Sequence, residues 1–258
     1  GILDNTGNEL DIGSGGVFGV GGLTSLNNGT INGGSIISGD GTVLNTLSSP
    51  FLNGVVFGSA AKPNLTINGD LQFNGDITLA AGAVVNKGSG TWYLNNTGLK
   101  KLTTVSGSAT LNSTGGQIIT GYSSGLNQVF QIDSGITLQG AGTINDYNAA
   151  SVINNGTIHA SGIGATFTIE IDGAGKTFTN AGTLRAGTGA ANSGTLSLPS
   201  ASWSNTGAFD VLVGGTMTLS GTGVNTGTLA TAGTLNLGGN ITTPILGTFT
   251  RTGGTVNI

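Results

Sequence analysis

The stretch NTGTLATAGTLNL, residues 225–237, contains the phrase from which most of this chain is built: a turn with Asn or Gly, then Thr, then an apolar residue. The phrase returns as NGTI at 28–31 and 155–158, and as NAGTL at 180–184. Each copy predicts a turn followed by a short strand with one apolar face. A short phrase repeated along a chain is typical of a solenoid, in which each coil packs only on its neighbours.

The composition favours an all-β fold over a disordered chain. Gly supplies 50 of 258 residues, well above the average of about 7%, and such a glycine content also occurs in disordered proteins. Disordered chains, however, carry charge and avoid apolar residues, whereas this chain is 36% hydrophobic and only 7% charged. Leu, Ile and Val recur at every second position, which is the period of a strand.

The spacing of the repeat gives the size of one coil. The glycine of the phrase falls at 156, 182, 207 and 227, so the intervals are 26, 25 and 20 residues. Three short strands and three turns fit this length, and neighbouring coils would lie about 4.8 Å apart. The sequence therefore predicts a parallel β-helix (β-solenoid) of about eleven coils of roughly 20–26 residues, in a rod about 50 Å long.

Asparagine and leucine have separate expected roles in such a coil. Asn tolerates the left-handed backbone of a corner, and its amide can bond its copy in the next coil to form a ladder. The leucines that follow Thr in the phrase share their strand parity with other apolar residues and are predicted to face the core. They are Leu184, Leu196, Leu229 and Leu235.

Three alternating triplets at 65–67, 71–73 and 77–79 have two readings. They are separated by Asn-Gly-Asp at 68–70 and at 74–76. Asn-Gly between two strands is a strong hairpin signal. The same corner chemistry recurs along the chain, however, and this favours successive sides of one coil over hairpins.

The chain is expected to be one elongated domain with an irregular beginning. Residues 1–64 form irregular N-terminal coils or a cap, both readings being open, and residues 65–258 continue them as a regular solenoid. Pro50 and Pro63 bracket a segment that is expected to be a loop or a covering segment, because Pro disfavours a central strand.

Charge and composition exclude several classes of function. Seven Lys and Arg against eleven Asp and Glu give a net charge of −4, without the basic stripe that nucleic acids require. No apolar run reaches the roughly 18 residues of a membrane helix, and no signal-peptide pattern follows Gly1. Cysteine is absent, so disulfides and thiolate metal sites are excluded. Few charges with abundant Asn, Thr, Ser and Gly indicate a bacterial exterior.

Acidic residues are the first candidates for chemistry. Glu170 and Asp172 are expected on the outer face of one strand, at a separation that two glycosidase carboxyls also adopt, with Lys176 near in sequence. Solubilising surface acids are the favoured interpretation. Asp70 and Asp76 occupy identical corners, which favours a turn role over a shared calcium ion.

Two further candidates, the stretch at 172–177 and His159, are better explained by structural roles than by chemistry. The stretch DGAGKT at 172–177 resembles a phosphate loop, but Glu170 stands where that motif needs Gly, and a tight turn is favoured. His159 is the only histidine, which excludes a metal site built on several imidazoles. It is expected on the outer surface.

The large aromatic residues are candidates for a sugar-stacking or contact surface. Trp92 and Tyr93 are adjacent, so at least one of them must point outward on a regular strand. The set comprises Trp92, Tyr93, Tyr122, Tyr147 and Trp203.

The phrases at 225–237 and 155–160 resemble the strand repeats of autotransporter passengers, and equally those of filamentous-haemagglutinin-type adhesins. The resemblance covers roughly residues 65–258 and is one of style, without an invariant motif. It implies a right-handed parallel β-helix on the bacterial cell surface or outside the cell. It supplies no catalytic residue.

These observations lead to an expected function with two alternatives. We expect a non-enzymatic structural or adhesive β-solenoid with no cofactor or metal, which presents an extended surface to a glycan or protein of a host or cell surface. One alternative is a filament subunit that stacks head to tail, since residues 250–258 stay in the repeat pattern and an open strand edge can pair with another chain. The other is a polysaccharide lyase or hydrolase.

Overall fold

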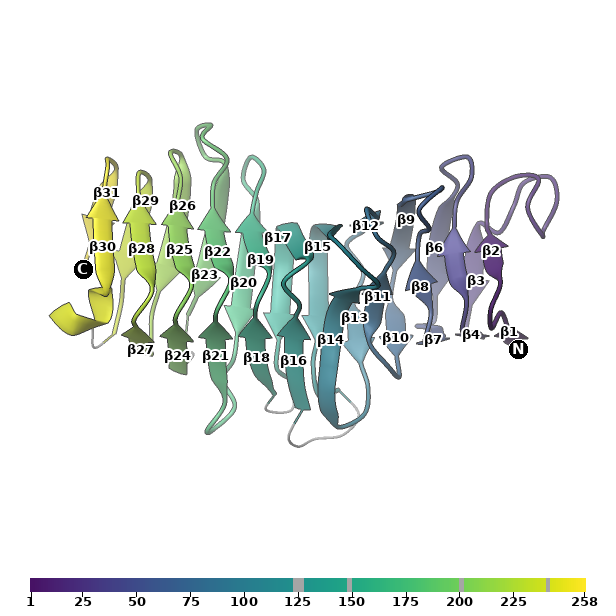
Figure 1. Ribbon diagram of the computed structural model, residues 1–258, viewed down its shortest axis with the longest axis horizontal. Helices are drawn as coiled ribbons and strands as arrows, with labels where there is room; N and C mark the ends of the chain where they lie inside the picture. The colour runs from purple at the N-terminus through teal and green to yellow at the C-terminus, as the bar shows by residue number, and fades with distance from the viewer. Residues whose placement is uncertain (123–127, 148–149, 200–201, 240–241) are drawn as a thin grey trace.

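In the computed structural model the chain forms a long rod of stacked coils, with the two termini at its opposite ends (Figure 1). The structure describes residues 1–122, 128–147, 150–199, 202–239 and 242–258. Within them there is no α-helix, and the coils make a parallel β-solenoid of about 10 turns. The prediction of eleven coils was slightly too high, because loops such as the glycine-rich segment 12–24 lengthen individual coils without adding a turn.

The strands belong to two sheets. The ten-stranded sheet contains β2 (Glu9–Asp11), β5 (Ser35–Ile37), β8 (Val56–Phe57), β11 (Ile77–Leu79), β14 (Gly98–Thr104), β16 (Gln128–Ile132), β18 (Ser151–Asn154), β21 (Thr177–Asn180), β24 (Ser202–Asn205) and β27 (Thr222–Asn225). The 21-stranded sheet contains β1 (Ile2–Asp4), β3 (Ser25–Asn27), β4 (Thr30–Asn32), β6 (Val43–Leu47), β7 (Phe51–Asn53), β9 (Asn64–Gly69), β10 (Leu71–Phe73), β12 (Val84–Lys87), β13 (Trp92–Leu94), β15 (Ala109–Ile119), β17 (Ile136–Asn145), β19 (Thr157–Ala160), β20 (Thr166–Glu170), β22 (Thr183–Ala186), β23 (Gly194–Leu198), β25 (Ala208–Val211), β26 (Gly215–Leu219), β28 (Thr228–Thr231), β29 (Thr234–Leu237), β30 (Thr248–Arg251) and β31 (Thr255–Asn257). A 3₁₀ turn, η1 (Thr243–Leu246), precedes β30.

Each coil contributes strands to three faces of the rod. The ten-stranded sheet is one face, and the larger sheet covers the other two. The larger sheet is continuous because β15 and β17 run around a corner and pair with each other along both faces. Gly116, with a φ of 67°, lies at this corner, where the backbone must take a left-handed conformation that suits glycine. The three-sided coil predicted from the repeat length is therefore the observed one.

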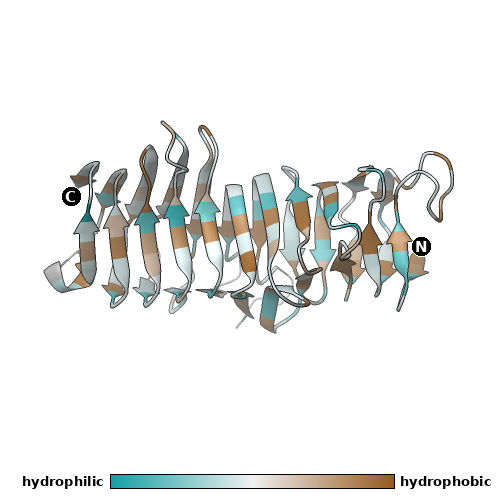
Figure 2. Ribbon diagram, turned by 45° about the horizontal axis from the view of Figure 1, so that its top comes forward, coloured by the Kyte–Doolittle hydropathy of each residue, from teal (hydrophilic) through white to brown (hydrophobic). Residues whose placement is uncertain are grey.

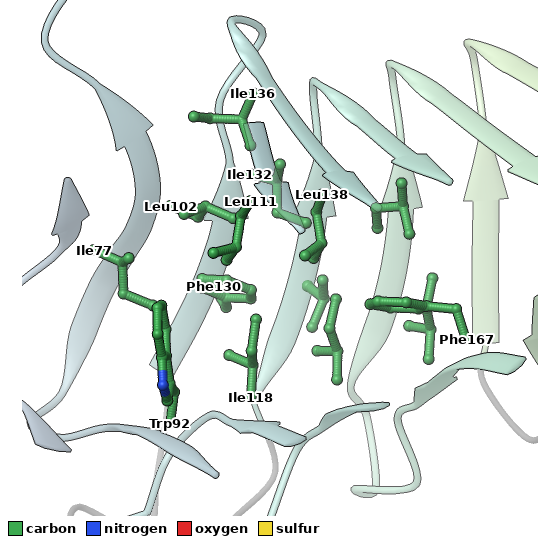
Figure 3. Close-up of a cluster of buried hydrophobic side chains, with 14 of the residues drawn as sticks. Ile77, Trp92, Leu102, Leu111, Ile118, Phe130, Ile132, Ile136, Leu138 and Phe167 are labelled. Carbon is green, nitrogen blue, oxygen red and sulfur yellow. The ribbon is translucent and has the colours of Figure 1, made fainter. Parts of the chain in front are cut away.

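The core is a continuous column of apolar side chains inside the coils. Strands alternate between buried and outward residues, and apolar and polar bands alternate along them in Figure 2. Leu184, Leu196, Leu229 and Leu235 are all buried, which confirms their predicted register. Figure 3 shows side chains such as Leu111, Leu138 and Phe130 stacked from coil to coil in this interior.

The triplets at 65–67, 71–73 and 77–79 are successive sides of one coil, as predicted, and not hairpins. They form β9, β10 and β11, and each pairs in parallel with the equivalent strand of the next coil, β12, β13 and β14. Asp70 and Asp76 sit at the two intervening corners. Their carboxylates accept hydrogen bonds from the backbone N–H of Thr91 (2.7 Å) and Lys101 (2.8 Å) in that next coil.

The segment between Pro50 and Pro63 is not a loop or cover, and that expectation was wrong. It contains β7 and β8, which pair with strands on both sides, and Phe57 is fully buried. Each proline lies just before a strand begins, where the missing N–H leaves no ladder hydrogen bond unmade. The carbonyl oxygen of each proline still accepts a hydrogen bond from a backbone N–H of the next coil.

The sequence predicted that the same asparagines form corners and amide ladders, but the structure divides these two roles between different asparagines. Asn28, Asn96 and Asn192 have positive φ at turns. A separate ladder of buried amides, formed by Asn154, Asn180, Asn205 and Asn225, closes the strands of the ten-stranded face. The Nδ2 of each of the first three donates to the Oδ1 of its neighbour in the next coil at 2.6–2.7 Å, and the Nδ2 of Asn225 donates to the carbonyl oxygen of Leu246 at 2.8 Å. The members are 26, 25 and 20 residues apart, the intervals of the glycine repeat.

Lys87 is a buried cation inside the rod. It ends β12, and its Nζ donates to the carbonyl oxygens of Gly90 (2.6 Å) and Gly115 (2.7 Å), near the corner of β15, and lies 6.0 Å from the ring centre of Trp92. No described carboxylate forms an ion pair with it. Burial lowers the pKa of Lys87 to about 8, because the charged ammonium loses its hydration.

The lowered pKa of Lys87 predicts that the free energy of unfolding of the protein rises between pH 7 and 10. The unfolded chain titrates near the ordinary pKa of 10.5, so in this range it holds more protons than the folded chain, and unfolding becomes less favourable as the pH rises. The shift from 10.5 to about 8 corresponds to about 3 kcal/mol in the free energy of unfolding, most of it gained between pH 7 and 10. Denaturant titrations of the wild type and of Lys87→Met, which lacks the titrating group, measure it. A wild-type profile parallel to that of the variant would contradict the assignment.

Candidate functional site

The most distinctive outward feature is a row of three tyrosines from three successive coils. Tyr93 lies in β13, Tyr122 follows β15 and Tyr147 follows β17. The ring centres of Tyr93 and Tyr122 are 4.5 Å apart, and those of Tyr122 and Tyr147 are 5.8 Å apart. Tyr93 is half-buried, whereas Tyr122 is 41% and Tyr147 is 63% exposed. We call these three residues the tyrosine row.

The two tryptophans of the predicted aromatic surface belong to the core instead. Trp92 is fully buried and packs against Phe57 and Phe73, with ring centres 5.7 and 5.4 Å away (Figure 3 shows its inward position). Trp203 packs against Phe209 at 5.6 Å. The expectation that one of Trp92 and Tyr93 points outward is confirmed, and the outward residue is the tyrosine.

An acidic group lies beside the row, at the ends of β17 and β20. Glu170 points outward, and its Oε2 accepts a hydrogen bond from Asn145 Nδ2 at 3.0 Å. Asp172 is exposed in the turn beyond β20. The carboxylate of Asp146 accepts the backbone N–H groups of Asp172 (3.3 Å) and Gly173 (3.1 Å).

Asp146 is the titratable residue that the sequence reasoning missed. It is buried, and this burial raises its pKa to about 6, against the lowering effect of the two N–H donors. The nearby Asp172 raises it further. Asp146 stands one coil before Asp172, and this spacing could have indicated that the two are neighbours. Neither residue lies in a copy of the repeated phrase, however, so the repeat did not align them.

The other sequence candidates have structural partners. His159 is half-buried on the outer parity of β19, and its Nε2 lies 2.8 Å from the carbonyl oxygen of Gly187. The next two coils place Arg185 and Asp210 in the same row, where they form an ion pair at 2.9 Å. Both side chains of this ion pair are partly exposed, so it adds at most a small surface stabilisation.

The phosphate-loop-like stretch is a tight turn, as predicted. Gly175 has a φ of 74°, and the N–H of Lys176 donates to the carbonyl of Gly173 at 2.9 Å before β21 begins. Among the described residues, no three acidic or histidine side chains converge so that they could hold a metal ion, and this includes Asp146, Glu170 and Asp172. None of the described helical segments has the length and apolarity needed to span a membrane.

Comparison with known proteins identifies no relative from which functional residues could be transferred to this chain. No protein-family model, no curated protein and no solved structure matches the chain significantly. The candidate functional site is therefore the tyrosine row together with the acidic group formed by Asp146, Glu170 and Asp172.

Proposed function

We propose that this chain is an extracellular structural or adhesive β-solenoid that binds a glycan or protein surface through its outer side chains and performs no catalysis. The observation that carries the proposal is the tyrosine row, in which a rigid ladder presents one large ring per coil along the rod. Exposed tyrosine is enriched where proteins bind partners, because a ring offers much contact area at a small entropic cost. The resemblance to the repeats of bacterial surface proteins supports the same function.

The acidic group supports binding better than catalysis. A glycosidase needs one carboxyl to donate a proton and a second to act as base or nucleophile across the same bond. Here Glu170 is engaged by Asn145, and Asp146 is buried against the backbone of the turn that carries Asp172. Glu170 and Asp172, the pair expected on the outer face of one strand, are therefore separated: Glu170 ends β20 beside Asn145, whereas Asp172 lies exposed in the turn beyond that strand.

We predict that Glu170→Ala combined with Asp172→Ala leaves the protein folded, with a loss of at most about 1 kcal/mol in stability, as for other surface side chains. Neither the wild type nor the variant is expected to release reducing ends from neutral or acidic polysaccharides. Chain-length analysis of glycans after long incubation measures this. Cleavage by the wild type that the variant lacks would replace the proposal with a hydrolase or lyase.

Self-assembly into a filament remains a separate hypothesis for the same fold. Strand edges at the end of a stack of coils can pair with a second copy. Electron microscopy over a range of protein concentrations distinguishes the two functions: fibres one rod wide favour the filament, and isolated rods favour the adhesive surface.

A further inference from the structure

The tyrosine row has a geometry that selects among ligands. Its rings come from consecutive coils and touch one another, so the row runs along the rod axis, one ring wide. Neighbouring coils of a parallel ladder lie about 4.8 Å apart, which is close to the length that one pyranose unit adds to an extended polysaccharide. The ring planes are tilted by 51° and 46° from one another, so a sugar chain parallel to the rod can meet successive rings with successive units, each unit at a different tilt.

The rings are held in place before any ligand arrives. Tyr93 is fixed within β13, which pairs with strands on both sides, and its ring packs against that of Tyr122. Tyr147 follows β17, which also pairs on both sides, and its ring centre lies 5.8 Å from that of Tyr122. The strand pairing that fixes Tyr93 reduces the conformational entropy lost on binding at that ring.

Charge near the row disfavours an anionic ligand. Burial raises the pKa of Tyr93, and the negative charge of Asp70, at the corner before β10, raises it further, so this carboxylate lies near one end of the row. The acidic group of Asp146, Glu170 and Asp172 lies beside the other end. Four nearby lysines balance these carboxyl groups only in part, since Lys87 is buried on the carbonyls of Gly90 and Gly115, and Lys101 pairs with Asp133 at 3.7 Å. The other two, Lys100 in β14 and Lys176 in the turn after Asp172, are half-buried. Carboxylates and side-chain amides also accept hydrogen bonds from hydroxyl groups.

We propose that the tyrosine row binds an uncharged, extended polysaccharide that lies parallel to the rod axis, its units stacked on Tyr93, Tyr122 and Tyr147 and its hydroxyls bonded to the flanking carboxylates and amides. This inference rests on the proposed adhesive function and names its ligand class. The apolar faces of pyranose rings suit aromatic rings, and their hydroxyls suit the acceptors beside them.

Affinity electrophoresis tests the site with defined probes. The gels contain hydroxyethyl cellulose, galactomannan or barley β-glucan as neutral chains, and polygalacturonate as the anionic chain. The wild type is expected to be retarded by at least one neutral chain and not by polygalacturonate. Tyr122→Ala with Tyr147→Ala is expected to weaken that retardation about tenfold or more.

Two matched variants separate a lost site from a damaged fold. Tyr122→Phe with Tyr147→Phe keeps the rings and should retain most of the retardation. Thr195→Ala with Thr216→Ala alters outward residues of β23 and β26 and should bind as the wild type does. Circular dichroism checks that every variant keeps the wild-type strand signal.

The outcomes are distinguishable. Retardation by neutral chains that survives the alanine pair, retardation by polygalacturonate alone, or no retardation by any chain each overturns the tyrosine-row inference. If the protein still binds cells or immobilised proteins in those cases, the adhesive function stands without this site. Shortening of the gel polysaccharide by the wild type would overturn the adhesive function itself.

Discussion

Replacing Leu229 with Asp is expected to lower the free energy of unfolding by more than about 4 kcal/mol and the melting temperature by about 10 °C or more. Leu229 is buried in β28, between Phe209 of one neighbouring coil and Phe249 of the other. An aspartate there loses the leucine packing and places a carboxylate where these aromatic neighbours offer it no cation. Thermal melts followed by circular dichroism measure the effect.

Thr228→Asp is the matched control for that experiment. Thr228 is exposed on the same strand and directly precedes Leu229, so it receives the same charge on the outer face. It should change stability by less than about 1 kcal/mol. Equal melting temperatures for the two variants would show that the register of β28 is wrong.

The second large effect is expected from the buried asparagine ladder. Asn180→Ala removes the acceptor of Asn154 and the donor to Asn205, and it frees the carbonyl of Ala208. Each buried polar group left without a partner costs about 1–3 kcal/mol, so the total loss should be about 3–5 kcal/mol. Urea titration is the appropriate measurement, since its slope also reports whether the variant unfolds as one unit.

An exposed ladder provides the comparison. Asn32, Asn53 and Asn74 make the same amide chain on the outside of the rod, with distances of 2.7 Å between Asn53 and Asn32 and between Asn74 and Asn53. Asn74 is exposed, so water replaces its bond to Asn53, and the buried Asn95, which donates to it at 3.4 Å, keeps its 3.1 Å bond to Gln72. Asn74→Ala should therefore cost less than about 1 kcal/mol. If the two substitutions were equally costly, burial of the ladder would not be the source of its stability.

Most of the fold could be predicted from the sequence because every coil repeats the same pattern of turns and alternating apolar residues. The alternation around Leu184 and Leu229, together with the glycine spacing, predicted strand parity, coil length and parallel stacking. The interior position of Lys87 could not be predicted, because a lysine on a strand usually faces water. Its burial depends on the carbonyl groups of Gly90 and Gly115, which only the three-dimensional corner brings together.

The candidate site was only partly predictable. The sequence named Tyr93, Tyr122 and Tyr147, but nothing in their spacing separated them from the buried Trp92. Tyr122 and Tyr147 lie just beyond the ends of β15 and β17 and outside the repeated phrase, so their alignment could be found only from the register of those strands. The raised pKa of Asp146 likewise depends on burial by a turn of the next coil.

The coil-to-coil register underlies the core, the asparagine ladder and the tyrosine row, and a disulfide scan tests it most directly. The chain has no cysteine, so introduced pairs report without interference. Thr195 and Thr216 are outward partners in β23 and β26, at a Cα separation of about 5 Å that a disulfide spans. Thr195→Cys with Thr216→Cys is expected to cross-link under mild oxidation. Thr195→Cys with Thr218→Cys, two residues further along the strand at about 8 Å, is expected to stay reduced. Cross-linking of the second pair without the first would contradict the register.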